Sequence, residues 1–243
     1  MASLKKNEKK FALFSNSHPM RVLGPSFAGV NQKEEVDMRT EKYYSPLYAG
    51  GFYHVFNRAN SNRDLLFTKD ENYFFFLDRY VNFLSPFVHT YAFCLIPNHF
   101  HLLIEVRPEE EIRAYLEEQK KWEKMKTASV EMVLSEAFRR FFISYAMSFN
   151  KADSRRGGLF QREFRRVRID SVYHFFAEVF YIHNNPLKHE VVSSIEEYSW
   201  SSYLPLLYGL DEHTDWLCRD KMLEWFGGVE NFKLFHKGKG DLI

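Results

Sequence analysis

The hydrophobic and polar positions of this chain follow two periods, and their order along the sequence predicts a fold. Four short segments are rich in aromatic and β-branched residues, as strands are: 50–59, 87–96, 99–106 and 159–169. Longer segments carry apolar residues at helical spacing: 69–84, 131–152 and 172–185. The order strand, helix, strand, strand, helix, strand predicts an α+β class, with a ferredoxin-like antiparallel sheet, packed helices and a helical C-terminal extension.

Turn and capping residues mark the ends of several of these elements. Pro97 and Asn98 separate two predicted strands that directly follow one another, so a hairpin is the natural connection. Asp70 is expected to cap the first helix, and Asp170 or Ser171 the last.

The pattern also divides the chain into regions. Residues 1–42 mix charged and apolar positions without a sustained period. Residues 107–129 are dense in charge, with six glutamates and six lysines or arginines. We predict a flexible or peripherally packed arm over 1–42 and a main domain over 43–170, with a helical insert at about 107–129. Residues 171–243 form the predicted C-terminal extension.

Composition narrows the class of protein. The chain has 243 residues, of which 45% are hydrophobic, so it can bury a substantial core. Two cysteines are too few for a disulfide framework, and we expect a reducing, cytoplasmic compartment. The longest apolar runs fall far short of the roughly 20 residues that span a bilayer, so we expect no membrane partner. The net charge of +1 means that a basic surface must be local.

Two histidines lie one residue apart in an apolar run, in the segment "IPNHFHLLIE". On a strand, His99 and His101 point to the same face, about 6.6 Å apart, while Phe100 points to the opposite face and into a core. A divalent metal would satisfy both imidazoles, and His54 could approach from a neighbouring strand. The alternative that both are ordinary sheet histidines stays open.

Positive charge is concentrated between residues 139 and 168. This segment holds nine basic and two acidic residues, a net charge of +7 in a chain whose total is +1. Arginines interleaved with aromatic residues are suited to holding phosphates and stacking on bases, which favours a nucleic-acid partner over a merely solvated face.

Tyr145 lies on the predicted helix that precedes the loop "DSRRGG". A tyrosine on an aromatic-rich helix usually packs in a core. Beside a metal or a base its hydroxyl can attack phosphorus, so its role depends on whether the helix packs beside the histidine strand.

Five blocks of the chain, in this order, resemble the single-tyrosine HUH transposases, most closely the REP-associated tyrosine transposases. The blocks are "YHVFNRANSNRDLLF" (53–67), "AFCLIPNHFHLLI" (92–104), "YAMSFNKADSRRGGLFQREFR" (145–165), "YIHNNPLK" (181–188) and "YSWSSYLPLLYG" (198–209). The likeness covers roughly residues 48 to 209.

The resemblance implies that residues 43–170 are an HUH catalytic domain, with a ferredoxin-like fold, that cleaves and rejoins single-stranded DNA, usually folded into a hairpin. His99 and His101 would bind Mg²⁺ or Mn²⁺. Tyr145 would be the nucleophile, which forms a 5′-phosphotyrosine link and frees a 3′-hydroxyl. The arginines expected to bind DNA are Arg58, Arg155, Arg156, Arg162, Arg165 and Arg166.

A third metal ligand is less well matched. Relatives often supply Gln or Asn one helical turn after the tyrosine, where this chain has Phe149. Asn150 is the candidate that we assign, and Gln161 and Glu163 are alternatives.

Two other functions stay open beside the transposase-like enzyme. One is a metal-dependent nuclease that uses water in place of tyrosine, with the same histidines. The other is a domesticated protein that binds DNA hairpins without chemistry. Relatives include dimers and monomers, so a homodimer is also an open alternative.

Overall fold

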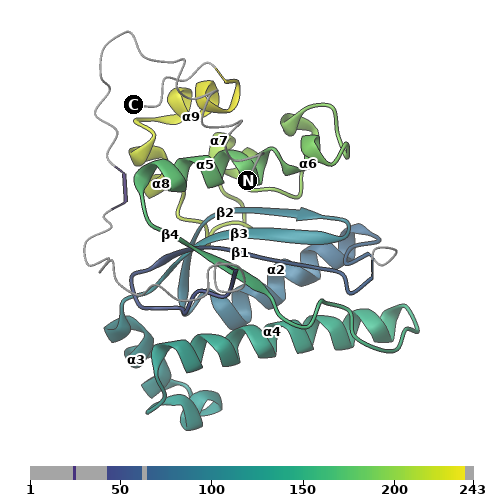
Figure 1. The fold of residues 1–243 in the computed structure, drawn as a ribbon, viewed down its shortest axis with the longest axis vertical. Coiled ribbons are helices and arrows are strands. Elements are labelled where there is room, and N and C mark those ends of the chain that lie inside the picture. The colour runs from purple at the N-terminus through teal and green to yellow at the C-terminus, as the bar shows by residue number, and fades with distance from the viewer. Residues whose placement is uncertain (1–23, 26–42, 62–64, 239–243) are drawn as a thin grey trace.

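A computed structural model describes residues 24–25, 43–61 and 65–238. The predicted arm over 1–42 therefore lies outside the described residues, apart from positions 24 and 25. The chain from Tyr43 onward builds one sheet with helices on both faces (Figure 1).

Four antiparallel strands form the sheet, in the spatial order β2-β3-β1-β4. The strands are β1 (Phe52–Arg58), β2 (Val88–Ile96), β3 (His99–Val106) and β4 (Arg165–Ile169). Helix α2 (Asp70–Leu84) connects β1 to β2, and α4 (Val130–Ala152) lies between β3 and β4. This order and these connections are those of the βαββαβ ferredoxin-like unit, so the predicted fold class is confirmed.

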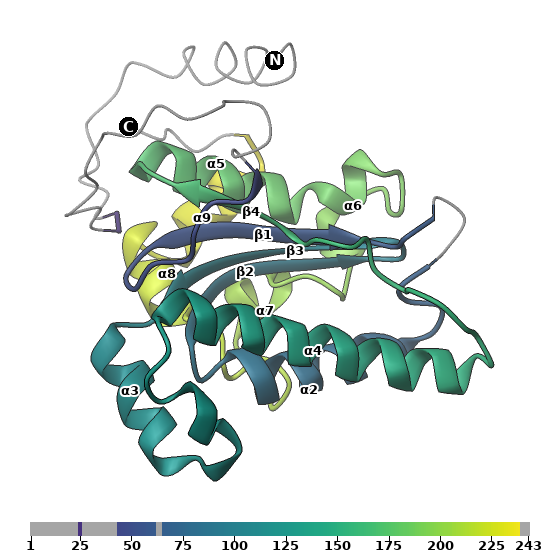
Figure 2. The same cartoon turned by 60° about the horizontal axis from the view of Figure 1, so that its bottom comes forward.

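Helices α2 and α4 cover one face of the sheet, below it in Figures 1 and 2. Strand alternation turns Phe100, Leu102 and Ile104 of β3 to this face, where all three are fully buried. Phe76 of α2 and Phe141 of α4 meet them, with a centroid separation of 4.9 Å between the two phenylalanine rings. The predicted inward face of the histidine strand is therefore confirmed.

The C-terminal helices cover the opposite face. They are α5 (Val172–His183), α6 (Asn185–Lys188), α7 (Tyr203–Tyr208), α8 (Arg219–Trp225) and α9 (Val229–His236), with a 3₁₀ turn at Ile195–Glu197. Leu103 of β3 joins a second apolar core there with Phe175 and Val179 of α5. On this face of β3, apolar helix residues cover Leu103, whereas polar residues lie at both ends: His99 and His101 next to the hairpin, and Glu105, which accepts from the Tyr91 hydroxyl, at the far end.

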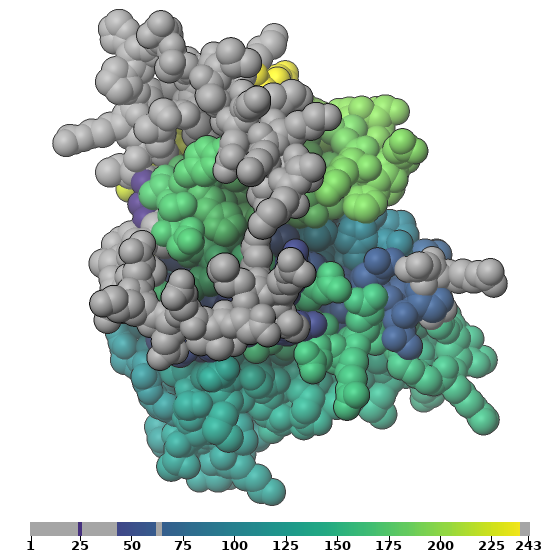
Figure 3. Space-filling view, in the orientation of Figure 1, coloured from purple at the N-terminus to yellow at the C-terminus, as the bar shows by residue number. Residues whose placement is uncertain are grey.

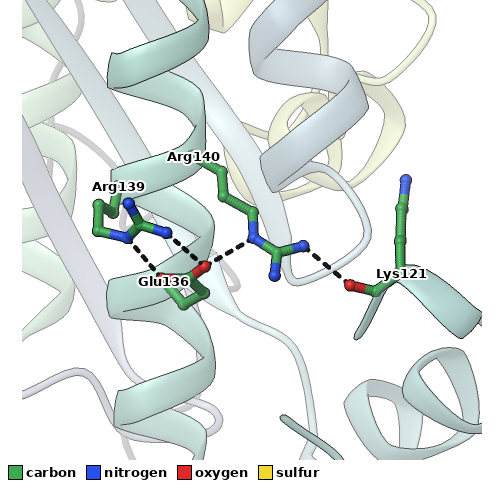
Figure 4. A network of polar contacts seen from close by, with 4 residues as sticks. All are labelled: Lys121, Glu136, Arg139 and Arg140. Carbon is green, nitrogen blue, oxygen red and sulfur yellow. Dashed lines mark hydrogen bonds and ion pairs between the residues drawn. The ribbon is translucent and has the colours of Figure 1, made fainter. Parts of the chain in front are cut away.

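The charged insert forms helix α3 (Glu109–Glu118) and a 3₁₀ helix, η2 (Lys120–Met125), at the lower end of the molecule (Figure 3). Trp122 of η2 is buried, and the Arg140 guanidinium lies 4.1 Å from its ring centroid. Figure 4 shows the polar contacts by which Arg140 of α4 is held beside η2. Glu136 accepts hydrogen bonds from Arg139 and Arg140, at 2.6 and 2.7 Å to their Nε atoms, and Arg140 also donates to the Lys121 carbonyl. These two arginines of the basic segment are therefore engaged within the protein.

Element ends agree with the sequence in part. The Ser171 hydroxyl caps α5 by accepting from the backbone N–H of His174, as predicted. Asp70 is not a cap: it is the first helical residue, and the side chain of Asn72 accepts from the Lys69 N–H instead. β4 begins only at Arg165, six residues later than predicted. Among the described residues no helix is long and apolar enough to cross a bilayer.

Candidate functional site

The histidine pair lies at the end of β3 next to the hairpin turn. The turn at Pro97 and Asn98 pairs Ile96 with His99, which places both imidazoles at one end of the sheet and on the face that α5 covers. The ring centroids of His99 and His101 are 5.0 Å apart, with the rings nearly perpendicular. Strand alternation thus brings the pair together as the sequence predicted.

His99 is held by the turn that precedes it. Its Nδ1 lies 2.6 Å from the Asn98 side-chain oxygen, which can only accept, so Nδ1 carries the hydrogen. Burial, and then the neighbouring His189, lower the pKa of His99 to about 4, against the opposing effect of Asn185. In the neutral ring Nε2 therefore carries the lone pair.

His101 is buried and contacts a second histidine. Its Nδ1 lies 2.9 Å from Nε2 of His54, the histidine that we expected to approach from a neighbouring strand. The other ring nitrogen of His101, Nε2, is buried and has no hydrogen-bond partner among the described residues. Burial, followed by the effect of His54, holds the pKa of His101 well below its usual value, so this ring too is neutral.

Glu178 of α5 lies behind His54. Its Oε2 is 3.1 Å from His54 Nδ1, and its Oε1 is 3.6 Å from His174 Nε2. Burial alone would raise the pKa of the Glu178 carboxyl, but His54 and His174 outweigh burial and hold it well below its usual range. Glu178 is therefore an ionised group beneath the histidines.

A pocket of about 270 Å³ opens over the histidine pair, and we call it the histidine pocket. Tyr181 of α5 lines it, with a ring centroid 5.4 Å from that of His101. Three cationic side chains also line it, from β1, β4 and α6: Arg58, Arg165 and Lys188. The Lys188 ammonium lies 4.7 Å from the Tyr181 ring centroid. The pocket thus joins a phenol, three imidazoles, of which His189 is the third, and a positively charged rim.

Asn185 adds an oxygen to this neighbourhood. Its side-chain nitrogen donates to the Tyr181 carbonyl at 3.0 Å, which turns its Oδ1 the other way. Among the described residues that oxygen is buried and has no hydrogen-bond partner at normal geometry, but the Asn185 side chain lies close enough to His99 to raise its pKa as a hydrogen-bonding group would. A buried carboxamide oxygen without a donor is costly unless another group meets it.

Tyr145 lies on the other side of the sheet. It is fully buried between α2, α4 and the sheet, with its ring 5.1 Å from that of Phe76. Its hydroxyl donates to the Leu66 carbonyl at 2.5 Å. The structure therefore does not bring Tyr145 to the histidine pair, because α4 packs on the face to which Phe100 points and not on the histidine face.

The remaining predicted residues are divided. Asn150 donates to the Gly157 carbonyl in the turn after α4 and does not line the histidine pocket. Gln161, an alternative ligand, does line it. Arg166 points to the α4 face and donates to the Ser45 carbonyl. The other predicted arginines, Arg155, Arg156 and Arg162, lie in the loop between α4 and β4 and are also absent from the lining. Their predicted contacts with DNA stay predictions.

Beside the two imidazoles, a hard divalent cation needs an oxygen ligand, for which Asn185 Oδ1 and the pocket-lining Gln161 are the candidates. Within the described ranges, no three His, Cys, Asp or Glu side chains gather closely enough to hold a metal ion. If two imidazoles bind the same ion, each with a nitrogen–metal distance of about 2.1 Å, their ring centroids must lie within roughly 6.5 Å of each other. The centroids of His99 and His101 are 5.0 Å apart and meet this condition. With Asn185 Oδ1 the site offers two nitrogens and the oxygen that such cations prefer.

Tyr181, Asn185 and Lys188 were not singled out from the sequence. A signal for the first two was present: a carboxamide follows Tyr181 by four residues, one helical turn, which is the spacing that Phe149 breaks after Tyr145. Nothing in the sequence alone indicated that Glu178 would meet His54, because that contact depends on how α5 crosses the sheet.

Comparison with known proteins gives a distant likeness. No protein-family model matches the chain, and no curated protein matches it. Among solved structures, it is similar to one of a REP-associated tyrosine transposase bound to a REP hairpin, at 15% sequence identity and a TM-score of 0.48. The likeness covers 69% of this chain and 86% of that chain. Since a likeness at this level concerns the fold alone, we argue function from the chain's own residues.

Proposed function

We propose that the histidine pocket cleaves and rejoins single-stranded DNA in a transposase-like reaction, with Tyr181 as the nucleophile. The observation that carries this proposal is that one pocket is lined by Tyr181, His99 and His101 and also by cationic side chains from three elements. A phenol, a metal-binding pair and phosphate-binding groups are the parts that tyrosine-mediated phosphoryl transfer needs.

His99, His101 and Asn185 are the residues that would hold Mg²⁺ or Mn²⁺. Two observations support this assignment: within the described part of the chain, His101 Nε2 and Asn185 Oδ1 are both buried and have no hydrogen-bond partner. When bound, such an ion withdraws charge from a phosphate oxygen and makes the phosphorus easier to attack. Asn185 takes the place that sequence analysis gave to Asn150.

The chain's own residues would then carry out the exchange of esters. The Tyr181 oxygen forms a bond to phosphorus as the bond from phosphorus to the 3′ oxygen breaks. The phenol loses its proton and the departing 3′ oxygen gains one, so that a 5′-phosphotyrosine and a 3′-hydroxyl result. Because the new ester replaces the old one, a 3′-hydroxyl can reverse the step and rejoin strands without another energy source.

Arg58, Arg165 and Lys188 would hold the backbone of the strand at the pocket. Each guanidinium or ammonium can pair with a phosphate, and binding of this kind weakens as salt rises. Arg165 also lies 5.9 Å from the Phe56 ring centroid, so a cation and an aromatic face lie side by side.

The test is a covalent adduct. Wild-type protein, incubated with Mn²⁺ and a hairpin-bearing single-stranded DNA, is expected to give a protein–DNA species that resists denaturant. Tyr181→Phe should abolish it, because the ring stays and only the attacking oxygen is lost. Tyr145→Phe, the matched control on the opposite face of the sheet, should leave it.

Each other outcome contradicts part of the proposal. An adduct that survives Tyr181→Phe and is lost in Tyr145→Phe would return the nucleophile to Tyr145 and require α4 to repack. Cleavage without any covalent species would favour a nuclease that uses water. Salt-dependent binding of the hairpin without cleavage would favour a DNA-binding protein without chemistry.

A further inference from the structure

We propose that Tyr43 and Arg165 form a base-stacking subsite at the edge of the histidine pocket, which holds an unpaired nucleobase next to the phosphate bound in the pocket. This inference rests on the proposed function for its substrate, single-stranded DNA, but the subsite needs neither a metal nor Tyr181. Tyr43 is a binding residue in this proposal and takes no part in the exchange of esters.

The subsite lies at the end of a row of side chains that crosses the sheet. Phe56 of β1 pairs with His101 of β3 on one side and with Arg165 of β4 on the other, and all three line the histidine pocket. Side chains of directly opposed residues lie on the same face, so these three are neighbours in one row. Adjacent strands are about 4.8 Å apart, which puts Arg165 about 10 Å from His101. A base of the strand whose phosphate lies over His101 can therefore reach the end of the row.

Tyr43 extends this row beyond the edge strand. The Arg165 guanidinium lies 5.6 Å from the Tyr43 ring centroid and 5.9 Å from that of Phe56. The two aromatic rings are themselves 6.3 Å apart and nearly perpendicular. Tyr43 is 39% exposed, so part of its ring remains open to a ligand. An exposed ring beside a planar guanidinium is a surface on which a base can stack.

The backbone after Tyr43 holds its ring at this place. The Ser45 N–H donates to the Arg166 carbonyl at 3.2 Å, and the Arg166 Nε donates to the Ser45 carbonyl at 2.7 Å. The hydroxyl of the buried Tyr53 donates to the Pro46 carbonyl at 2.8 Å. These contacts fix the segment along β4 without using the Tyr43 side chain. The ring is therefore positioned before a ligand arrives, which lowers the entropic cost of binding, and its removal should leave the fold intact.

The charges around the subsite indicate what occupies it. The residues that line the histidine pocket include Arg58, Arg165 and Lys188 but no aspartate or glutamate. Within the part of the chain that the structure describes, no carboxylate forms an ion pair with Arg165. Such a site suits a ligand with a negative charge beside a planar apolar face. An unpaired nucleotide has both, whereas the bases of a duplex keep their faces stacked on one another.

The direct test follows the stacking of single bases. The probe is a DNA hairpin with an oligothymidine tail on each side of its stem, in EDTA, so that no divalent metal takes part. 2-Aminopurine replaces each tail base in turn, because its fluorescence falls when it stacks on an aromatic ring. We expect one tail position to be quenched by the wild-type protein and by Tyr43→Phe, which keeps the ring, and to stay bright with Tyr43→Ala.

Tyr48→Ala is the matched control. Tyr48 belongs to the same segment and also lies beside an arginine, with its ring centroid 5.9 Å from the Arg168 guanidinium. Arg168 pairs with Tyr53 and points to the face of the sheet that α4 covers, away from the histidine pocket. This variant should therefore quench the same tail position as the wild-type protein.

Affinity supplies a second readout, measured by fluorescence anisotropy of the labelled hairpin. Tyr43→Ala should weaken binding roughly 5–100-fold, the loss of one base stack, and Tyr48→Ala should change it little. An abasic nucleotide at the quenched position should weaken binding to the wild-type protein by a similar factor. It should weaken binding to Tyr43→Ala little further, because both changes remove the same contact.

The outcomes separate this subsite from the proposed function. The subsite is overturned if Tyr43→Ala loses as much affinity for abasic DNA as for intact DNA at every tail position. Equal losses in Tyr43→Phe and Tyr43→Ala would also overturn it, because the hydroxyl and not the ring would then make the contact. A coupled tail position without a DNA adduct in Mn²⁺ would support the subsite and overturn the proposed function. An adduct without any coupled position would do the reverse.

Discussion

Tyr145 and Tyr181 show how strongly the setting of a residue decides its chemistry. Burial raises the pKa of the Tyr145 phenol well above its usual value, and its hydroxyl is already bonded to the Leu66 carbonyl. Tyr181 is half-buried and lines the histidine pocket. Of the two, Tyr145 is thus built as a core residue and Tyr181 as a pocket residue.

Stability measurements should distinguish these two tyrosines. Tyr145→Phe removes a buried hydrogen bond and is expected to cost about 1–2 kcal/mol of unfolding free energy. Tyr181→Phe, at the pocket, should cost less than about 0.5 kcal/mol. Urea unfolding of both variants checks this, and equal losses would show that the Tyr145 hydroxyl is not held as described.

At the residue scale, the sequence predicts what alternation controls and little more. The common face of His99 and His101, and the inward direction of Phe100, follow from the two-residue period of a strand. Helical spacing shows which side of α4 is apolar, and Tyr145 is on that side. Helical spacing does not show which face of the sheet α4 covers. Because α4 covers the face opposite the histidines, Tyr145 is separated from them.

At the element scale, α4 illustrates a basic stretch that is partly neutralised. Arg139 and Arg140 share Glu136, whose side chain is 20% exposed. Hydrogen bonds from Arg139, and then from Arg140, outweigh burial and lower the pKa of Glu136 to about 2. These contacts tie α4 to the 3₁₀ helix of the insert and leave the cationic rim of the pocket to other elements.

Removal of the shared carboxylate should have a small and salt-dependent effect. Glu136→Gln is expected to cost less than about 1 kcal/mol, because Arg139 is mostly exposed and solvent screens its pair. The loss should fade as pH falls from about 4.5 toward 2, where wild-type Glu136 itself becomes protonated. Urea unfolding in low and high salt checks this, and a loss that high salt leaves unchanged would contradict an electrostatic origin.

At the scale of the whole molecule, a buried histidine chain joins the C-terminal helices to the sheet. His236 donates from Nδ1 to the Phe232 carbonyl, so its Nε2 accepts from His183 Nδ1–H at 2.8 Å. The Ser202 hydroxyl then donates to His183 Nε2 at 2.7 Å and accepts from the Phe93 N–H of β2. Both imidazoles are neutral in this chain of bonds.

The free energy of unfolding should therefore fall at acid pH. Burial lowers the pKa of His236 to about 4 and that of His183 well below its usual value, whereas both titrate near 6.5 when unfolded. The unfolded chain then binds more protons below pH 6.5, so stability falls as pH drops from about 6.5 to 4, by up to about 1.4 kcal/mol per pH unit for each histidine.

Urea unfolding at pH 7.5 and pH 5 checks this window. His236→Leu should lower stability at pH 7.5 and reduce the further loss on going to pH 5. His213→Gln, at an exposed histidine, serves as a control that keeps the wild-type dependence. A pH dependence that is the same in wild type and His236→Leu would show that this histidine chain is not the source.

The fold itself was largely predictable, whereas the layer that completes the pocket was not. Strand and helix periods and the turn at Pro97 were enough for the order of β1 to β4 with α2 and α4. The position of α5 over the sheet depends on contacts between residues far apart in the chain, such as that of Phe175 with Phe52 at 5.7 Å between centroids. Local sequence patterns do not encode such distances.

Helix α5 carries both Glu178 and Tyr181, three residues apart, so the two residues move together as parts of one rigid element. It is fixed at its start by the Ser171 cap and at its end by His183 against Ser202. A slide by one residue would move both side chains about 1.5 Å along the axis together. The contact of Glu178 with His54 and the position of the Tyr181 phenol in the pocket therefore cannot be adjusted separately by backbone movement. A change in the position of Glu178 that leaves Tyr181 in place, or the reverse, therefore requires a side-chain substitution.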